Sequence, residues 1–191
     1  ILNYTVKGII FYQGCSNVGD PGNQYSERLK LLVEQWRGQF GLGEIPFYFV
    51  EIAPYHYDNV EADWGARLRE QQFRAQQIIP NSSLVSTNDL VYPYETTQIH
   101  PAQKRQVGER LAYTALSRDY GVEGLWYKSS SYKDMTVKEG KVYLHLQDEY
   151  GAMSRFENIE GFASETMTPR RLMRRLRRLP RRILLARPAL K

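Results

Sequence analysis

Two polar clusters, each at the expected end of a strand or loop, hold the residues with the most informative chemistry. The first is the run Gln13 to Asn17 (Gln-Gly-Cys-Ser-Asn), which follows the apolar run 6–12. The second ends in His100, which stands directly before Pro101. A neutral imidazole can take a proton from a nucleophile and return it to a leaving group, and amide donors stabilise the oxyanion of acyl transfer. Because ligands bind outside the carboxyl ends of strands in α/β proteins, the two clusters together predict a hydrolase site.

The first cluster supplies the hydrogen-bond donors. Gln13 and Asn17 carry side-chain amides, and Gly14 lets a substrate approach the backbone. Donors of this kind, aimed at a developing oxyanion, are what acyl transfer needs. Glycine, serine and asparagine also favour turns, so a simple turn is the alternative interpretation.

The nucleophile is the missing part of this site. Cys15 could form a thiol–imidazole pair with His100, although we favour Cys15 as a small buried hydrophobic residue. A nucleophile elbow around Gly14 and Ser16 lacks its second glycine, because Val18 stands at that position. We therefore find no convincing serine nucleophile beside the two clusters.

A hydrolytic histidine usually has a carboxylate that fixes its tautomer. Asp89 and Glu95, which precede His100 in the chain, are the candidate acid partners. Thr97 stands three residues before His100, so the chain has no Asp-x-x-His pair at this point. A backbone carbonyl that orients the ring, with both carboxylates merely solvated, is the alternative.

The other two histidines have a weaker context. His56 lies in a tyrosine-rich loop that could line a substrate cleft, and His145 lies in an expected hairpin strand. Three dispersed histidines without cysteines or paired acids at ligand spacing predict no metal site. We expect no cofactor either.

Composition and charge place the chain among folded proteins. It has 191 residues, of which 42% are hydrophobic and 13% aromatic, enough for one domain or part of a larger one. Its single cysteine excludes an internal disulfide, and no apolar run approaches the about 20 residues of a membrane span. The chain begins with Ile1 and no initiator methionine, so we expect a fragment or a processed chain.

The basic character of the chain is confined to its last segment. The 26 basic and 21 acidic residues give a formal net charge of +5, yet ten basic residues and no acid lie in 168–191, so residues 1–167 carry a net charge of −5. Arginine pairs alternate with leucines in this tail. Three interpretations of this tail stay open: a disordered segment, non-native sequence such as an out-of-frame translation, or an arm that binds nucleic acid or an anionic membrane surface.

Apolar periodicity predicts strands that alternate with helices, and hence a parallel sheet covered on both faces. Beyond Gly121 two short strand patterns flank Glu139-Gly140, which predicts a hairpin and the start of a β module. The expected strands are 4–12, 45–52, 83–87, 133–137 and 141–146, and the expected helices are 24–39, 63–79 and 101–120, with Pro101 in the first turn of the last helix. The expected domains are residues 1–121, 122–167 and 168–191.

Six stretches in order along residues 3 to 162 resemble the sialate O-acetylesterase family of SGNH-type hydrolases. These stretches are residues 10–17, 36–37, 46–55, 68–72, 99–104 and 107–112. The resemblance implies a flavodoxin-like three-layer α/β fold, present in part, with the first strand and helix missing and the start of a β module following it. It also implies a serine esterase that removes acetyl groups from sialic acid or a related sugar, in a periplasmic, secreted or lysosomal setting.

The resemblance assigns roles to some of the residues above. His100 matches the family's catalytic histidine, and Gln13, Gly14 and Asn17 match the segment that supplies oxyanion and substrate contacts. Cys15 occupies a position often held by glutamate. The family's serine lies upstream in a Gly-Gln-Ser-Asn-like motif, which residues 1–191 lack, so we expect the chain alone to be inactive.

Two other functions stay open at this point. One is a cysteine-dependent hydrolase that uses Cys15 and His100. The other is a non-catalytic remnant that binds carbohydrate, or nucleic acid through the tail 168–191. The expected partner is an O-acetylated sugar, with no nucleic acid unless the tail binds it and no membrane span; the sequence leaves the oligomeric state open.

Overall fold

The computed structural model describes residues 2–57, 63–139 and 141–147. The chain divides into two units, Ile1–Lys128 and Ser129–Lys191. The tail 168–191 and the later part of the expected β module lie outside the described residues. Among the described helices, none has both the length and the apolar character that a bilayer span requires.

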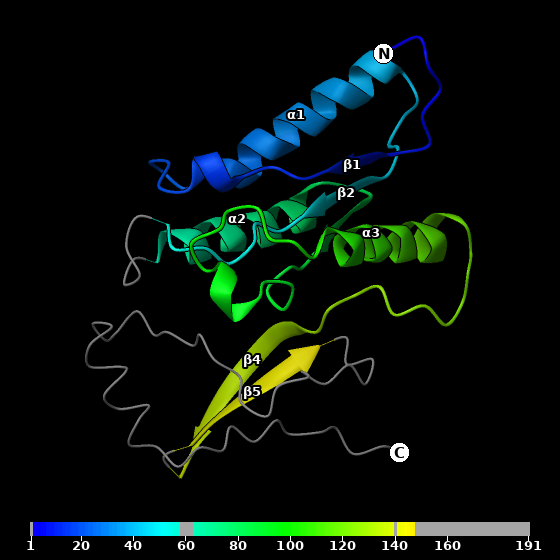
Figure 1. Ribbon diagram of the computed structural model, residues 1–191. Coiled ribbons are helices and arrows are strands. Elements are labelled where there is room, and N and C mark those ends of the chain that lie inside the picture. Colours follow the sequence, from blue (N-terminus) through cyan, green and yellow to red (C-terminus); the bar gives the residue numbers. More distant parts are fainter. Residues whose placement is uncertain (1, 58–62, 140, 148–191) are drawn as a thin grey trace. The chain divides into compact units, whose positions relative to one another are not determined.

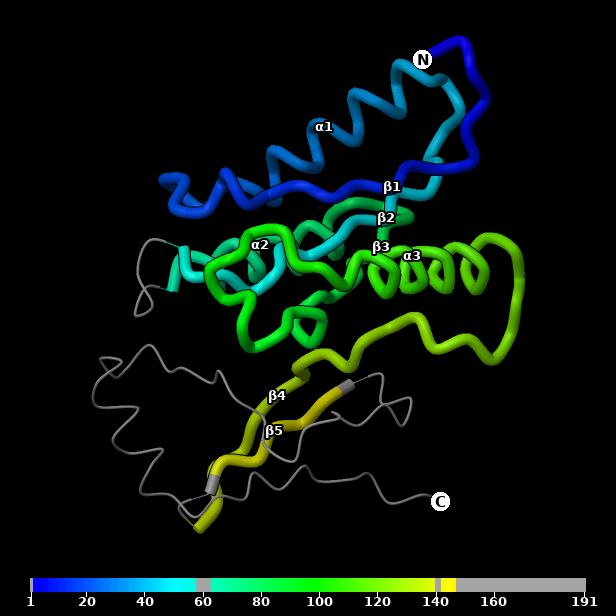
Figure 2. The backbone as a smooth tube through the Cα atoms, viewed as in Figure 1, coloured from blue at the N-terminus to red at the C-terminus, as the bar shows by residue number. Residues whose placement is uncertain are grey.

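The first unit alternates strands and helices along the chain (Figure 1). Its strands form one parallel sheet in the order β1-β2-β3, in which Phe47 of β2 pairs with Ile9 on one side and Ser82 on the other. Figure 2 follows the chain from β1 through α1 to β2, and on through α2 to β3. The predicted parallel α/β arrangement is confirmed. The elements are β1 Ile9–Phe11, α1 Tyr25–Phe40, β2 Phe47–Val50, α2 Trp64–Ile78, β3 Ser82–Val85 and α3 Lys104–Asp119, with short 3-10 helices η1 Cys15–Asn17 and η2 Pro93–Glu95.

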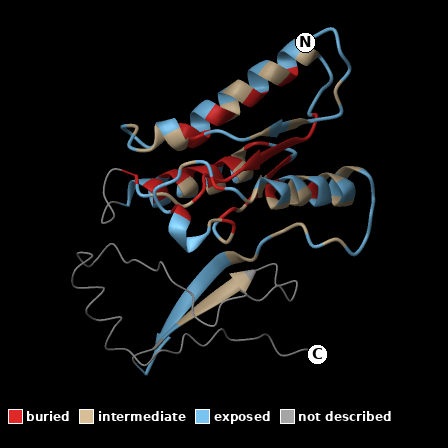
Figure 3. Ribbon diagram, in the orientation of Figure 1, coloured by how far each residue is buried: buried red, intermediate tan, exposed pale blue. Residues whose placement is uncertain are grey.

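Strand β2 is the centre of the core, and its side chains alternate between the two faces of the sheet, as strand geometry dictates. Phe47 and Phe49 pack into the cluster formed with α1 and α2. Val50 packs on the opposite face with Val107 of α3. Figure 3 shows the buried residues gathered on β2 and on the inner sides of α1 and α2. The unit therefore has three layers, with α1 and α2 on one face of the sheet and α3 on the other.

The first strand is shorter than predicted. The pattern 4–12 predicted a long strand, but β1 covers only Ile9–Phe11. The N–H of Ile9 donates to the carbonyl of Pro46 at 2.8 Å, and Pro46 has no N–H with which to continue the ladder. The pairing with β2 therefore cannot extend toward the start of the chain.

The third helix begins later than predicted. It starts at Lys104, so Pro101 lies in the preceding loop and not in the first turn. The N–H of Ala102 donates to the carboxylate of Glu95 at 2.9 Å, which holds this segment in a loop. His100 consequently lies in a loop, four residues before the helix.

The second unit contains the predicted hairpin. Strands β4 (Ser131–Lys138) and β5 (Lys141–Gln147) are antiparallel, and Glu139 in the turn has a φ of 52°. The ladder is irregular between Tyr132 and Asp134. His145 of β5 pairs with Asp134 of β4 in the ladder, and its Nε2 lies 3.3 Å from Oγ1 of Thr136.

Candidate functional site

The site is built where three strands of the sheet end. Because β1, β2 and β3 are parallel, the segments that follow them, 12–17, 51–57 and 86–100, leave the sheet at the same edge. Ligands bind at this edge in open α/β sheets. Hydrogen bonds join the segments. Among them, Tyr57 Oη donates to Cys15 Sγ at 3.4 Å, and the N–H of His56 donates to the carbonyl of Thr96 at 3.0 Å.

The first segment turns sharply and folds its amides together. Gln13 Nε2 donates to Asn17 Oδ1 at 2.7 Å, and Asn17 Nδ2 donates to Asp20 Oδ2 at 2.9 Å. Each amide nitrogen carries two hydrogens, so these bonds do not exhaust the donors of either side chain. The structure therefore brings Gln13, Gly14 and Asn17 together in one turn, with amide donors available at its surface.

Gly14 is required by the geometry of this turn. Its φ is 148°, and a Cβ at this position would lie 2.9 Å from Cγ2 of Ile52. The backbone at Gly14 thus lies so close to Ile52 of the β2 exit that there is no room for a side chain at position 14. Cys15, the next residue, is half-buried and packs against the core cluster, in keeping with its interpretation as a small apolar residue.

Gln72 of α2 fixes the two strand exits relative to each other, a role that the sequence analysis did not identify. Its side chain is fully buried. Oε1 accepts the N–H of Ile52 at 2.9 Å, while Nε2 donates to the carbonyls of Gln13 at 3.3 Å and Val50 at 3.4 Å. The only available signal was a glutamine on the side of an amphipathic helix that faces the core.

Tyr25 adds a second brace to the first segment. Its hydroxyl donates to the carbonyl of Gln13 at 2.9 Å. Burial raises the pKa of Tyr25 to about 12, so the phenol keeps its proton across the physiological range. The carbonyl of Gln13 is therefore held from two helices, by Tyr25 of α1 and Gln72 of α2.

Glu95 shapes the loop that carries His100. The carboxylate is buried, and its oxygens accept the N–H of Tyr92 at 3.0 Å and of Ala102 at 2.9 Å. These bonds hold both ends of the segment that contains His100. His100 itself is exposed. The contacts give Glu95 a positioning role on the backbone of this loop.

Asp89, the other candidate partner of His100, makes a two-pronged ion pair with α3. Its carboxylate oxygens lie 2.8 and 2.6 Å from the guanidinium nitrogens of Arg110. Arg110 also donates to the carbonyl of Ser86 at 2.7 Å. This pair anchors the β3 exit to α3, on the side of the sheet where the His100 loop leads into that helix.

The helix after His100 returns to the first cluster. Nζ of Lys104, at the start of α3, lies 5.2 Å from the ring centroid of Tyr12, the residue before Gln13. Such a cation–π contact places the start of α3 beside the β1 exit. The structure thus brings the segments of both predicted clusters to one edge of the sheet.

A further buried carboxylate, also missed in the sequence, lies at the end of β2. Glu51 accepts hydrogen bonds from Ser86 Oγ at 2.9 Å and Asn88 Nδ2 at 3.1 Å. Burial raises the pKa of this carboxyl, and the hydrogen bond from Ser86 and the charge of Arg69 partly oppose that rise. Glu51 therefore joins the β2 and β3 exits beneath the surface of the site.

The remaining two histidines lie in the β2 exit and in the second unit. His56 is exposed, and its backbone N–H bonds the His100 loop, while His145 belongs to the separate second unit. Within residues 2–57, 63–139 and 141–147, no group of three or more His, Cys, Asp or Glu side chains is arranged to hold a metal ion.

Comparison with known proteins identifies the family. Residues 1–117 match the model of the carbohydrate esterase family described as sialic acid-specific acetylesterase. The chain belongs to this esterase family. It is 28% identical over 162 residues to the sialate O-acetylesterase of Mus musculus, covering 76% of this chain and 29% of the relative, and 27% identical over 161 residues to that of Homo sapiens, covering 76% and 30%.

A solved structure supports the same assignment. A carbohydrate acetylesterase from Xanthomonas citri superimposes with a TM-score of 0.66 at 34% identity, covering 76% of this chain and 33% of that one. The predicted family and the predicted SGNH-type α/β fold are confirmed, the fold over part of the chain. This member of the esterase family spans about three tenths of the length of the curated relatives it matches.

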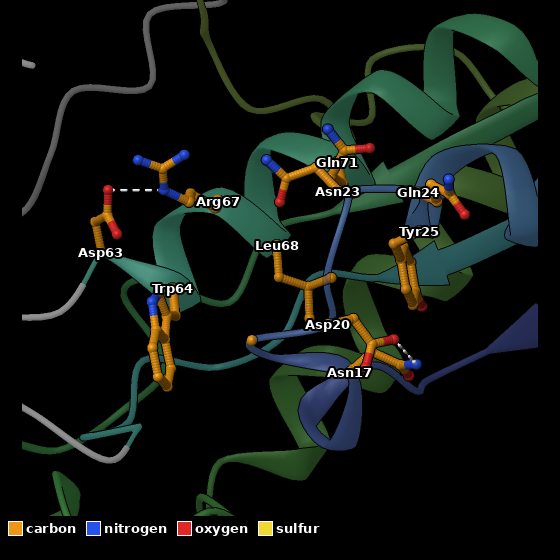
Figure 4. Close-up of a pocket in the computed structure, with 11 residues that line it drawn as sticks. Asn17, Asp20, Asn23, Gln24, Tyr25, Asp63, Trp64, Arg67, Leu68 and Gln71 are labelled. Atoms are coloured by element: carbon orange, nitrogen blue, oxygen red, sulfur yellow. Dashed lines mark hydrogen bonds and ion pairs between the residues drawn. The ribbon is translucent and has the colours of Figure 1, made fainter.

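A pocket opens in the first unit beside the turn that holds Gln13, Gly14 and Asn17 (Figure 4). Its volume is about 260 Å³, and its walls come from the segment 17–25 and the first two turns of α2. Asn17 belongs both to this pocket and to the cluster with Gln13. The pocket has no signature in the local sequence, because its two walls are distant in the chain.

Proposed function

We propose that this chain supplies the histidine and the oxyanion donors of an acetylesterase that removes O-acetyl groups from sialic acid or a related sugar. One observation carries the proposal: the segment with Gln13 and Asn17 and the loop with His100 leave the same edge of a parallel sheet, within the region that matches the family. Gln72 and Glu95 support it, since they brace these segments from within.

The proposed chemistry is acyl transfer through a serine. His100 takes the proton of the serine hydroxyl as that oxygen attacks the acetyl carbonyl, and returns the proton to the sugar oxygen that leaves. N–H groups of Gln13, Gly14 and Asn17 donate to the oxyanion that forms. Water, activated by the same imidazole, then releases acetate and restores the serine.

The serine itself is expected outside residues 1–191. These residues contain no Gly-Gln-Ser-Asn-like motif, and the relatives are more than three times as long as the region they share with this chain. We therefore propose that the chain by itself does not turn over an acetyl ester. Enzymes that lose their nucleophile retain only the contributions of binding and the oxyanion site.

Asp89 and Glu95 stay the candidates for the acid that orients His100. The contacts favour an indirect role for each, through Arg110 for Asp89 and through the loop backbone for Glu95. In that arrangement a substitution at Glu95 alters kcat by moving His100, and not by removing a carboxylate charge from beside the imidazole.

The test compares two proteins and two histidine substitutions. Acetate release from O-acetylated N-acetylneuraminic acid is measured for the full-length protein that carries this chain, and 4-nitrophenyl acetate hydrolysis for residues 1–191. We expect His100→Ala to lower kcat of the full-length protein by about a hundredfold or more. His56→Ala, an exposed histidine at the same sheet edge, is the matched control and should keep the parental rate.

Two outcomes would contradict the proposal. An unchanged kcat in the full-length His100→Ala protein would show that His100 is not the general base of the reaction. Turnover by residues 1–191 that depends on His100 would place a nucleophile within the chain, and Cys15 would be the first residue to examine. Rapid alkylation of Cys15 by iodoacetamide at neutral pH would then identify a reactive thiolate.

A further inference from the structure

The pocket beside Asn17 has an aromatic wall. Trp64, the first residue of α2, is 45% exposed although it is a large apolar side chain. Gly19, with a φ of 84°, lies against its six-membered ring, where a Cβ would be 3.3 Å from Cε3. Gly19 thus packs directly against the indole ring and helps to hold it beside the pocket. An indole fixed at a hollow offers the broad flat surface on which the apolar C–H face of a sugar ring can pack.

The remaining walls are rich in side-chain amides. Asn17, Asn23, Gln24 and Gln71 all line the pocket, and Figure 4 shows them arranged around it with Trp64 at one side. An amide both donates and accepts hydrogen bonds, and so matches the hydroxyl groups of a sugar. The buried Ser26 hydroxyl donates to Gln71 Oε1 at 2.9 Å, which fixes the orientation of that amide.

The charges of the pocket favour a neutral ligand. Its walls carry two carboxylates, Asp20 and Asp63, and one guanidinium, Arg67. Arg67 Nε lies 2.8 Å from Asp63 Oδ2, and Asp20 is paired with Arg28 at 3.2 Å. Among its described residues, the lining therefore has no excess of positive charge with which to attract a carboxylate or phosphate, so its chemistry suits an uncharged polyol.

We propose that this pocket is a subsite for a neutral pyranose that is linked to the acetylated sugar, with Trp64 as its stacking platform. The position supports this role, because Asn17 lines the pocket and also belongs to the turn with Gln13 and Gly14 that is proposed to bind the oxyanion. The link to an acetylated sugar rests on the proposed function. Such a subsite would make the esterase select acetylated sugars that are part of a glycan over free monosaccharides.

Binding can be tested without any ester chemistry. The chain has three tryptophans, so a ¹⁵N-labelled sample gives three indole N–H signals, which Trp→Phe variants assign. Lactose, cellobiose and xylobiose are titrated in turn as neutral probes, and sodium N-acetylneuraminate as the anionic probe. We expect at least one neutral disaccharide to shift the Trp64 signal in a saturable manner, with no shift at Trp126, which is exposed but lies outside the pocket.

Variants supply the second readout. Trp64→Ala should weaken the binding of that disaccharide about tenfold, which is about 1.4 kcal/mol, because the aromatic contact is lost. The side-chain amide signals of the pocket report this binding. Trp64→Phe, which keeps a smaller ring, should lose less. Trp126→Ala is the matched control and should bind as the parent does. The two remaining indole signals report whether each variant keeps its fold.

Each result decides the proposal. No saturable shift of Trp64 with any of the three disaccharides overturns it, as does binding that survives Trp64→Ala. Binding of N-acetylneuraminate at Trp64 in preference to the disaccharides overturns the neutral class. Since the probes carry no acetyl ester, a positive result stands even if the His100 test fails, and a negative result here leaves that test unaffected.

Discussion

Replacing Gln72 by leucine should damage the site more than any single surface change, because one side chain braces two strand exits. Leucine has a similar volume, so the substitution removes the polar atoms without leaving a large cavity. The N–H of Ile52 then loses its acceptor, and the carbonyls of Gln13 and Val50 lose a donor. All of this takes place around a side chain that is 0% exposed, where water cannot replace the lost partners easily.

The expected cost follows from these three groups. An unsatisfied buried polar group costs about 1–3 kcal/mol, and a carbonyl that has another lone pair lies toward the low end. The buried N–H of Ile52 carries the largest share, so the free energy of unfolding should fall by about 3 kcal/mol. This is a large part of the total for a small domain, which is about 5–15 kcal/mol.

Urea unfolding followed by circular dichroism measures this loss. With a slope of about 2 kcal/mol per molar urea, the midpoint should fall by about 1.5 M. Gln77→Leu, an exposed glutamine on the same helix, is the matched control and should stay near the parental midpoint. Equal midpoints for the two variants would refute the idea that Gln72 holds the strand exits together.

Two further predictions concern the same unit. Gly14→Ala should destabilise it by about 2 kcal/mol, since the new methyl group meets Ile52 at a backbone conformation that alanine rarely adopts, and a urea midpoint equal to that of the parent would contradict this. Stability should also fall at high pH: burial, followed by the hydrogen bond to Asp119, raises the pKa of Tyr48 to about 12, and burial does the same for Tyr25. Unfolded tyrosines ionise near pH about 10, so the folded state favours the protonated phenols, and their contribution is complete below that pH and lost as the pH rises through 12. Urea midpoints measured across this range should decline, and Tyr48→Phe should reduce the decline; a flat profile would rule out the effect.

Much of the fold follows from local patterns in the sequence. Helix α1 buries Tyr25, Leu29 and Val33, which recur at helical spacing, and it ends at Gly41, whose φ of 64° suits glycine. The aromatic and β-branched run at 45–52 predicts a strand whose ends lie within a few residues of those of β2. The order of strands and helices then favours a parallel sheet by the rules for crossovers.

Element ends were less well predicted, because they depend on partners elsewhere in the chain. The length of β1 is limited by Pro46 at the start of its neighbour. The start of α3 is delayed by Glu95, which binds the N–H of Ala102. Neither effect has a signature in the local sequence of the element that it changes.

The sequence by itself determined which residue types could perform acyl transfer, and that Gln13, Gly14, Asn17 and His100 follow strands or precede a helix. Only the tertiary structure decided how the segments around them are held. Gln72 and Glu95 are an ordinary helix glutamine and loop acid in the sequence, and they become braces because folding buries them beside unpaired backbone groups. Trp64 and Asn17 form a pocket for a related reason, because parallel strands bring segments that are distant in the chain to one edge of a sheet. Local sequence periodicity does not indicate which segments meet there.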